Sequence, residues 1–133
     1  NRNVVSVNGA LKIDLYGQVC AESLGFRQIS GTGGQADFVR GAAWSEGGMS
    51  FIAAPSCWYD RNGVRHSRIT LALSPGSAVT TPRSDTHYVV TEYGAANLRG
   101  KTLDARARLL ISLAHPDFRD ELTFEARRAG LII

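Results

Sequence analysis

A glycine-rich junction between a strand-like segment and a helix-like segment most constrains how this 133-residue chain can fold. The stretch from 31 to 38 reads Gly-Thr-Gly-Gly-Gln-Ala-Asp-Phe, with glycine at Gly31, Gly33 and Gly34. Glycines allow a tight turn and leave backbone N–H groups unshielded by a Cβ atom. The helix predicted behind them presents further free N–H groups and a partial positive charge. We therefore expect this junction to bind an anion, which is a phosphate, a carboxylate or the oxyanion of an acyl transfer.

Apolar periodicity predicts strands and helices mixed along the chain, followed by two helices. The run 49–54 is almost continuously apolar, which is typical of a strand buried on both faces, and Asn62-Gly63 predicts a hairpin turn. Further strands are expected over 3–8, 10–15, 67–73 and 86–91, a loop over 74–85, and helices over 35–44, over 102–113 and from 116 to a stop at Gly130. This order predicts an α/β layer structure.

The size and composition of the chain limit its classes of partner. With 44% hydrophobic residues, residues 1–133 can bury one core, so we expect a single domain. The net charge of +3 is too small for a nucleic-acid footprint, and no segment is long and apolar enough to span a bilayer. We therefore expect neither nucleic acid nor a membrane as partner. Cys20 and Cys57 lack CxxC spacing, and we interpret them as reduced residues of a cytoplasmic protein.

Other motifs fit less well. The pattern Gly31-x-Gly33-x-x-Ala36 satisfies the dinucleotide fingerprint, but the acid that this fingerprint needs at the end of the next strand is missing. No Gly-Lys-Ser or Gly-Lys-Thr follows, which excludes a phosphate loop. The three histidines have no metal-ligand spacing, so no metal site is expected; they are His66, His87 and His115.

Seven short motifs, in order over nearly the whole chain, resemble the C-terminal domain of the acetyl-CoA hydrolase/transferase family. That family includes 4-hydroxybutyrate, butyrate and succinate CoA-transferases. Each motif alone is a weak signal, but their order and natural spacing are specific. The motifs are VNGAL (7–11), DLYGQV (14–19), GTGGQADF (31–38), TTPR (80–83), VTEYG (90–94), LRG (98–100) and AHPDFR (114–119).

The resemblance implies a CoA-transferase-type α/β fold, a layered sheet with flanking helices, and transfer of coenzyme A between an acyl-CoA and a small carboxylate. In the family a glutamate attacks the thioester and forms a glutamyl-CoA thioester. We expect that nucleophile upstream of the matched residues, in an N-terminal half that this chain lacks. The chain is therefore expected to be a domain truncated on its N-terminal side and inactive alone.

The matched glycine loop has a physical role in such chemistry. Attack on a thioester or an acyl anhydride places negative charge on a carbonyl oxygen, and losing one fixed backbone donor there typically costs about 3 kcal/mol. We predict that the N–H of Gly33 or Gly34 is this donor, with a purely structural tight turn as the alternative. Gly31 and Gln35 are predicted to contact CoA or the carboxylate, although Gln35 fits an exposed first-turn residue equally well.

Glu92 is the acid with the strongest claim to a role. It follows the apolar run 88–91, which suggests burial, and a buried carboxylate must be paired or protonated. By resemblance it lies near the active cleft, and we predict that it supports catalysis by orienting loops or by pairing with Arg83 or Arg99. A purely structural salt bridge is the alternative. Arg83 is predicted to meet a CoA phosphate, with a solvated loop arginine as the alternative.

Several alternatives stay open. Transfer and hydrolysis pass through the same intermediate and differ in whether a carboxylate or water resolves it. Outside catalysis, a module that binds a nucleotide or another anion fits the glycine corner, and an oligomerisation domain is a third option. Family members are commonly dimers or larger, so the resemblance also implies a possible homo-oligomer.

Overall fold

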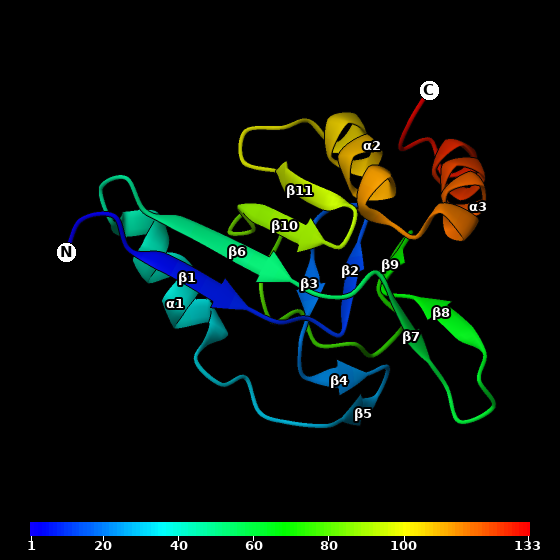
Figure 1. The fold of residues 1–133 in the computed structure, drawn as a ribbon, viewed down its shortest axis with the longest axis horizontal. Coiled ribbons are helices and arrows are strands. Elements are labelled where there is room, and N and C mark those ends of the chain that lie inside the picture. Colours follow the sequence, from blue (N-terminus) through cyan, green and yellow to red (C-terminus); the bar gives the residue numbers. More distant parts are fainter.

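A four-stranded mixed sheet lies at the centre of the computed structural model, which describes residues 1–133 (Figure 1). Its order is β1-β6-β10-β11, with β1 (Val5–Asn8), β6 (Met49–Ala53) and β10 (Tyr88–Thr91) parallel and β11 (Gly94–Asn97) antiparallel to β10. The arrowheads of the three parallel strands point the same way in Figure 1. Their carboxyl ends therefore meet at one edge of the sheet, which we call the carboxyl edge.

Smaller strands form a second layer and two hairpins. A three-stranded sheet has the order β3-β2-β9, and two separate hairpins pair β4 with β5 and β7 with β8. The bounds are β2 (Lys12–Asp14), β3 (Val19–Cys20), β4 (Ser23–Leu24), β5 (Arg27–Gln28), β7 (Cys57–Tyr59), β8 (Arg65–Ser67) and β9 (Ile69–Thr70). The Asn62-Gly63 turn joins β7 to β8, which confirms the predicted hairpin.

Three helices complete the fold. Helix α1 (Gln35–Trp44) packs on β1 and β6, α2 (Leu103–Leu113) packs on β10 and β11, and α3 (Pro116–Arg128) packs on α2. Thr102 caps α2 through a hydrogen bond from the Ala105 N–H, as Ser and Thr commonly do at this position. None of the three helices is long and apolar enough to cross a membrane.

One core joins both sheets and all three helices. Its members are buried apolar side chains that form one contiguous cluster. They include Ile13 and Leu15 around β2, Val39 of α1, Ile52 of β6, Val89 of β10, Leu110 of α2 and Leu122 of α3. The α/β layer structure expected from the sequence is confirmed.

Strand β6 is buried on one face only. Ser50 and Ile52 are buried toward α1 and the core, whereas Phe51 and Ala53 are half-buried and Met49 is 38% exposed. The prediction of a strand buried on both faces is therefore wrong for this structure, because every helix that contacts the sheet packs on the Ile52 side. The opposite face has no covering element.

Candidate active site at the carboxyl edge of the sheet

Three loops and the start of a helix meet at the carboxyl edge. Gly9 follows β1, Ser56 follows β6 and Glu92 follows β10. Helix α1 begins beside Gly9, because the Gln35 Nε2 donates a hydrogen bond to the Gly9 carbonyl at 2.8 Å. Ligands of open α/β sheets bind outside the carboxyl ends of the strands. The structure thus brings the glycine loop and Glu92 to one edge, and the strands β1 and β10 that lead to it lie two strand spacings, roughly 10 Å, apart.

The glycine loop presents free backbone donors. Residues 31–34 are exposed, and the N–H groups of Gly31 to Gly34 have no acceptor within the protein. Gly33 has φ +58°, a conformation that strongly favours glycine. A Cβ atom placed on Gly31 or Gly33 would meet nothing within 4 Å, so the space beside these donors is open. Such a row of free N–H groups at the start of a helix can receive an anion.

Gln35 is held by the protein at both ends of its amide. Its Nε2 donates to Gly9, and its Oε1 accepts from the hydroxyl of Thr81 at 2.7 Å. Gln35 is 7% exposed and Thr81 is fully buried. The predicted exposed first-turn residue is therefore wrong, since this side chain fixes the start of α1 against two other loops.

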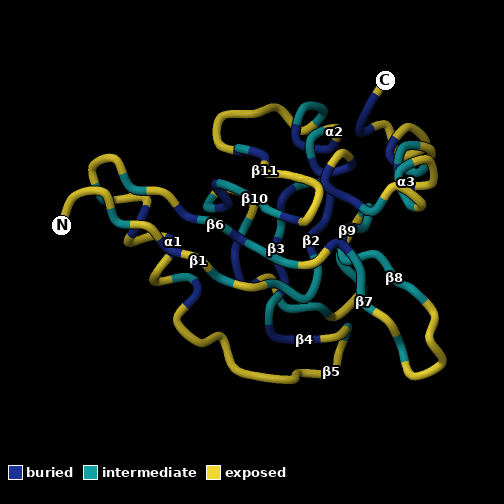
Figure 2. The backbone as a smooth tube through the Cα atoms, viewed as in Figure 1, coloured by how far each residue is buried: buried dark blue, intermediate teal, exposed yellow.

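The segment that carries the glycines is also held at its N-terminal end, by Thr80. The Thr80 hydroxyl donates to Glu22 at 2.8 Å and accepts from the Ala21 N–H at 3.0 Å. Glu22 also accepts from Gln28 at 3.1 Å. Between these two anchors, residues 26–34 are all exposed (Figure 2). Adjacent hydroxyls at 80 and 81 thus pin both ends of an exposed loop.

Glu92 is exposed, and its partner is a backbone donor. Its Oε1 accepts from the Ser56 N–H at 2.7 Å, and no ion pair joins it to Arg83 or Arg99. The predicted burial and the predicted arginine partner are therefore both wrong. The reason is that β10 ends at Thr91, so Glu92 already belongs to the turn outside the sheet.

The surroundings of Glu92 favour its ionised form. Reduced contact with water acts to raise the pKa of Glu92, but hydrogen bonds from Ser56 and the nearby His115 outweigh it and hold the pKa below its usual value. A shallow hollow beside the carboxylate is lined by Ala53, Pro55 and Val90, together with Ala54, Thr91 and Glu92 itself. A carboxylate anchored through one oxygen therefore borders a hollow at the carboxyl edge.

Arg83 has an exposed side chain, while its carbonyl belongs to a buried network. The guanidinium of Arg106 donates to the carbonyls of Arg83 at 2.7 Å, Tyr16 at 3.2 Å and Lys101 at 3.3 Å. Arg106 is 9% exposed, and this burial, with the nearby charge of Arg83, lowers its pKa. Arg106 was not predicted from the sequence, although an arginine close to the apolar positions of a predicted helix was a usable signal.

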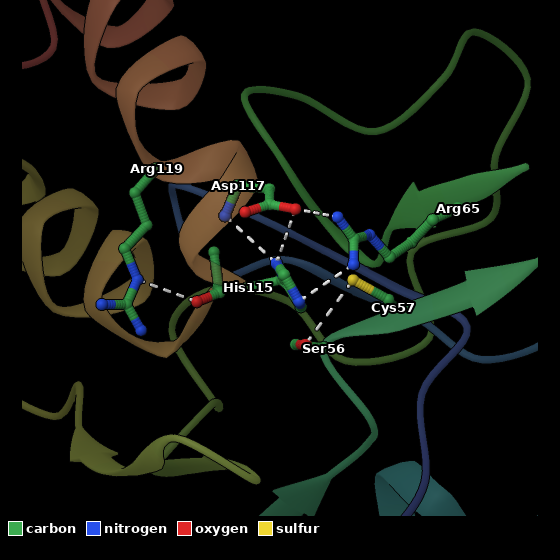
Figure 3. A network of polar contacts seen from close by, with 7 residues as sticks. Ser56, Cys57, Arg65, His115, Asp117 and Arg119 are labelled. Atoms are coloured by element: carbon green, nitrogen blue, oxygen red, sulfur yellow. Dashed lines mark hydrogen bonds and ion pairs between the residues drawn. The ribbon is translucent and has the colours of Figure 1, made fainter.

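A polar network lies at the start of α3 (Figure 3), and its His115 is the residue whose charge lowers the pKa of Glu92. Arg65 of β8 contacts both His115 and Asp117, and the His115 Nδ1 accepts from the Asp117 N–H. The ring of Tyr93 packs edge-on against His115, and Arg119 lies over the same ring at 5.2 Å. These contacts attach the turn that carries Glu92 to the hairpin β7–β8 and to α3.

One cysteine contacts this edge, because the Cys57 Sγ accepts a hydrogen bond from the Ser56 hydroxyl at 3.6 Å (Figure 3). Cys20 is buried and free, and Cys57 is half-buried and free. The structure contains no group of three or more His, Cys, Asp or Glu side chains arranged to hold a metal ion.

Comparison with known proteins gives the family. The profile described as the acetyl-CoA hydrolase/transferase C-terminal domain matches residues 1–126. The chain belongs to the acetyl-CoA hydrolase/transferase family. The resemblance carried by the seven motifs is therefore confirmed, and the family member described here matches its relatives over almost the whole chain.

Among its relatives, the chain is similar to the butyryl-CoA:acetate CoA-transferase of Anaerostipes caccae, with 53% identity over 97% of the chain. It is also similar to the 4-hydroxybutyrate coenzyme A transferase of Clostridium kluyveri, with 54% identity over 96% of the chain. It covers 29% of the length of each of these relatives. The chain thus spans less than a third of the transferases that it matches.

Two solved structures share the fold. RipA from Yersinia pestis is 52% identical and superimposes with a TM-score of 0.86, over 99% of this chain and 29% of that one. The 4-hydroxybutyrate CoA-transferase of Porphyromonas gingivalis is 41% identical with a TM-score of 0.67, over 94% of this chain and 26% of that one. The expected CoA-transferase-type α/β fold is confirmed.

Proposed function

We propose that this chain is one domain of a CoA-transferase that moves coenzyme A between an acyl-CoA and a small carboxylate such as acetate or 4-hydroxybutyrate. The nucleophilic glutamate lies outside the chain, in an N-terminal part of the same enzyme. The free N–H groups of Gly33 and Gly34 at the carboxyl edge, in a chain of this family, are the observation that carries the proposal. The chain alone is expected to be inactive.

The proposed reaction uses this domain as a source of fixed donors. A glutamate carboxylate from the N-terminal part attacks the carbonyl carbon of the acyl-CoA thioester, and the thiolate of CoA leaves. The thiolate then attacks the glutamyl carbonyl of the resulting anhydride, which releases the acyl carboxylate and leaves glutamyl-CoA. Each attack places negative charge on a carbonyl oxygen, and the N–H groups of Gly33 and Gly34 stabilise such charge without needing to reorganise.

The other site residues have supporting roles in this proposal. Gly31 lets the ligand approach the loop, because no side chain fills the space beside it. Gln35 keeps the loop in register and offers its second amide hydrogen to CoA or the carboxylate. Arg83 has an exposed guanidinium that can pair with a CoA phosphate. Glu92 positions the loop at Ser56, and the free cysteines fit a cytoplasmic enzyme.

A matched pair of glycine substitutions in the full-length enzyme tests the oxyanion role. Gly33 and Gly63 have φ +58° and +76°, and a Cβ atom at either position meets nothing within 4 Å. Alanine therefore adds similar backbone strain at both sites, about 1–2 kcal/mol. We expect Gly33→Ala to displace the donors and lower kcat about 100-fold or more, and Gly63→Ala to leave kcat unchanged. Equal kcat values in the two variants would contradict the role of the loop.

Gly34→Val is a second test in the same enzyme. The Cβ atom would lie 2.9 Å from the ring of Phe38, which is exposed and can turn away. We therefore expect near-normal folding by circular dichroism together with a loss of turnover. Normal turnover would remove Gly34 from the list of donors.

Complementation separates the enzyme from a non-catalytic binding module. Supplying the N-terminal part of the enzyme to this chain is expected to restore CoA transfer from acetyl-CoA to a carboxylate. Tight CoA binding by the chain with no restored transfer would favour a binding module. Because the family also includes acetyl-CoA hydrolases, CoA release is measured without a carboxylate acceptor, and rapid release under that condition identifies a hydrolase.

A further inference from the structure

One face of the three parallel strands β1, β6 and β10 is apolar and is not covered by any helix or loop of this chain. Strand pairing places Val5 beside Met49, Val7 beside Phe51, and Phe51 beside Tyr88. The rings of Phe51 and Tyr88 stack with their centroids 4.9 Å apart. We call this surface the open face, and it consists of Val5, Val7, Met49, Phe51, Tyr88 and Val90.

The side-chain pattern of β1 is the reverse of what an exposed sheet face requires. Val5 and Val7 are 56% and 66% exposed, while Ser6 between them is 7% exposed and faces α1. A sheet with one face in water normally turns its apolar residues toward the core. Here the apolar residues of β1 point away from the core, so this face is built to be buried.

Strand β6 leads to the same conclusion. Its sequence from Met49 to Ala53 is apolar except for Ser50, which is the composition of a strand buried on both faces. The chain covers only one of those faces. The second face needs a cover from outside these residues, and the six residues of the open face include no charged group.

We propose that the open face seats the N-terminal part of the same polypeptide, the part that supplies the nucleophile in the function proposed above. Relatives extend well beyond this chain, which covers 29% of their length. The open face is continuous with the hollow at Glu92, because Ala53 and Val90 belong to both the sheet and the hollow. A domain seated on the open face therefore forms the missing wall of that hollow and brings its own residues to the carboxyl edge.

A second copy of this chain fits the open face less well. A symmetric pair would place the same surface on both sides. In that arrangement each Glu92 hollow would face the same surface of the other copy and not the part of the enzyme that carries the proposed nucleophile. The N-terminal part instead completes the site that it covers.

Hydroxyl-radical footprinting of the full-length enzyme tests whether the open face is covered, without any measurement of activity. Met49 is the single methionine of the chain and lies on the open face, whereas Trp44 of α1 lies off it and is 84% exposed. With Met49 fully buried at the interface, we expect its oxidation to be at least about tenfold slower than in the urea-unfolded enzyme. Trp44 is expected to react nearly as fast as in the unfolded enzyme. Met49 is 38% exposed in this chain, and this exposure implies a certain protection from oxidation. Protection no greater than that value in the full-length enzyme would overturn the proposal.

Dilution distinguishes the two occupants. Protection of Met49 that persists when the enzyme is diluted to monomers supports the N-terminal part, because that contact lies within one polypeptide. Protection that disappears with the oligomer assigns the open face to a second copy and overturns the proposal. Because the experiment measures oxidation and not activity, it tests the interface separately from the proposed reaction. An enzyme with a different reaction would still protect Met49 if the N-terminal part covers the open face, and a CoA-transferase without that contact would not.

A pair of aspartate substitutions in the full-length enzyme provides a second readout. Val7 lies on the open face, and Val64, 51% exposed, lies in the β7–β8 hairpin away from it. We expect Val7→Asp to lower the Tm and speed the oxidation of Met49, since it buries a charge against an apolar partner. Val64→Asp is expected to change neither quantity. Equal Tm values and equal rates of Met49 oxidation in the two variants would contradict the proposal.

Discussion

Gln35 illustrates how a single side chain can position a loop. Its Oε1 accepts from Thr81 and its Nε2 donates to Gly9, so the side chain joins three separate segments. An amide NH2 group has two hydrogens, and only one of them has a protein acceptor here. In the function proposed above, the second hydrogen is the one that meets CoA or the carboxylate. The position of the glycine loop therefore depends on a hydroxyl 46 residues further along the chain.

Substitution of Thr81 tests that dependence at the scale of one hydroxyl. Thr81→Val in the full-length enzyme removes the donor to Gln35 and leaves a buried acceptor unpaired, at a cost of about 1–3 kcal/mol. We expect kcat to fall because the glycine loop loses its register, and we expect Thr81→Ser to recover most of it. Stability and kcat are measured together by urea unfolding and initial rates. A serine variant as impaired as valine would show that packing of the methyl group matters instead.

At the scale of elements, Arg106 attaches α2 to the loops around it. One guanidinium donates to three carbonyls on two other segments and on the turn before α2. It also lies where a Cβ atom on Gly17 would be 3.0 Å away, so the Gly17 turn and the arginine fit only together. Helix α2 therefore fixes the backbone of the loop at Arg83, while the Arg83 side chain stays exposed.

Two arginines of α2 provide a matched comparison of buried and exposed contacts. Arg106→Met leaves three carbonyls without their charged donor, and we expect it to lower the free energy of unfolding by at least about 3 kcal/mol, since a single hydrogen bond to a charged group contributes about 1.5–3 kcal/mol. Arg108, half exposed, pairs with Asp104 in the same helix, and Arg108→Met is expected to cost about 0.5 kcal/mol. Urea unfolding of the full-length enzyme measures both, and equal losses would contradict the assigned role of Arg106.

The helices were more predictable than the strands for physical reasons. Helix α1 was predicted at its observed bounds, because its apolar positions follow a helical period and Gly47-Gly48 end it. Strand β11 was missed, since Gly-Ala-Ala-Asn has little strand propensity and forms only by pairing with β10. The predicted strand over 67–73 is shared by β8 and the two-residue β9, because each pairs with a different partner.

At the scale of the whole molecule, acid sensitivity has an identifiable source in His87. This histidine is 7% exposed, its Nδ1 is buried without a hydrogen-bond partner, and its ring packs on Tyr88. Burial, with a smaller contribution from the charge of Arg99, lowers the pKa of His87 below its ordinary value of 6.5. The unfolded chain therefore binds a proton near pH 6.5, whereas the folded chain binds it only at lower pH. Folding stability consequently falls as the pH drops below 6.5.

Replacing the imidazole of His87 should reduce the loss of folding stability at acid pH. His87→Phe keeps an aromatic ring against Tyr88 but cannot be protonated, so we expect its Tm to fall less than that of the natural enzyme between pH 7 and pH 5. Thermal melts of the full-length enzyme across this range provide the measurement. An unchanged slope in His87→Phe would place the acid sensitivity elsewhere.

The candidate site was predicted in its parts and not in its assembly. The glycine motif and Glu92 were identified from local sequence, because each is a short motif with its own chemistry. Their placement at one sheet edge follows from the parallel order β1-β6-β10, which only long-range pairing determines. The partner of Glu92 was wrong for the same reason, since Ser56 lies 36 residues away and no charge pattern indicates a backbone donor.

The anchoring of the exposed segment 26–34 has a mechanical consequence. Neighbouring residues 80 and 81 hold its two ends, and both are also bonded to the backbone of Val19 in the second sheet. Both ends of the segment therefore depend on one short stretch, and a substitution that displaces Thr80 and Thr81 is expected to loosen both ends together. A trypsin cut after Arg27 leaves both of these anchors in place, so the nicked enzyme is expected to keep Gln35 at the start of α1.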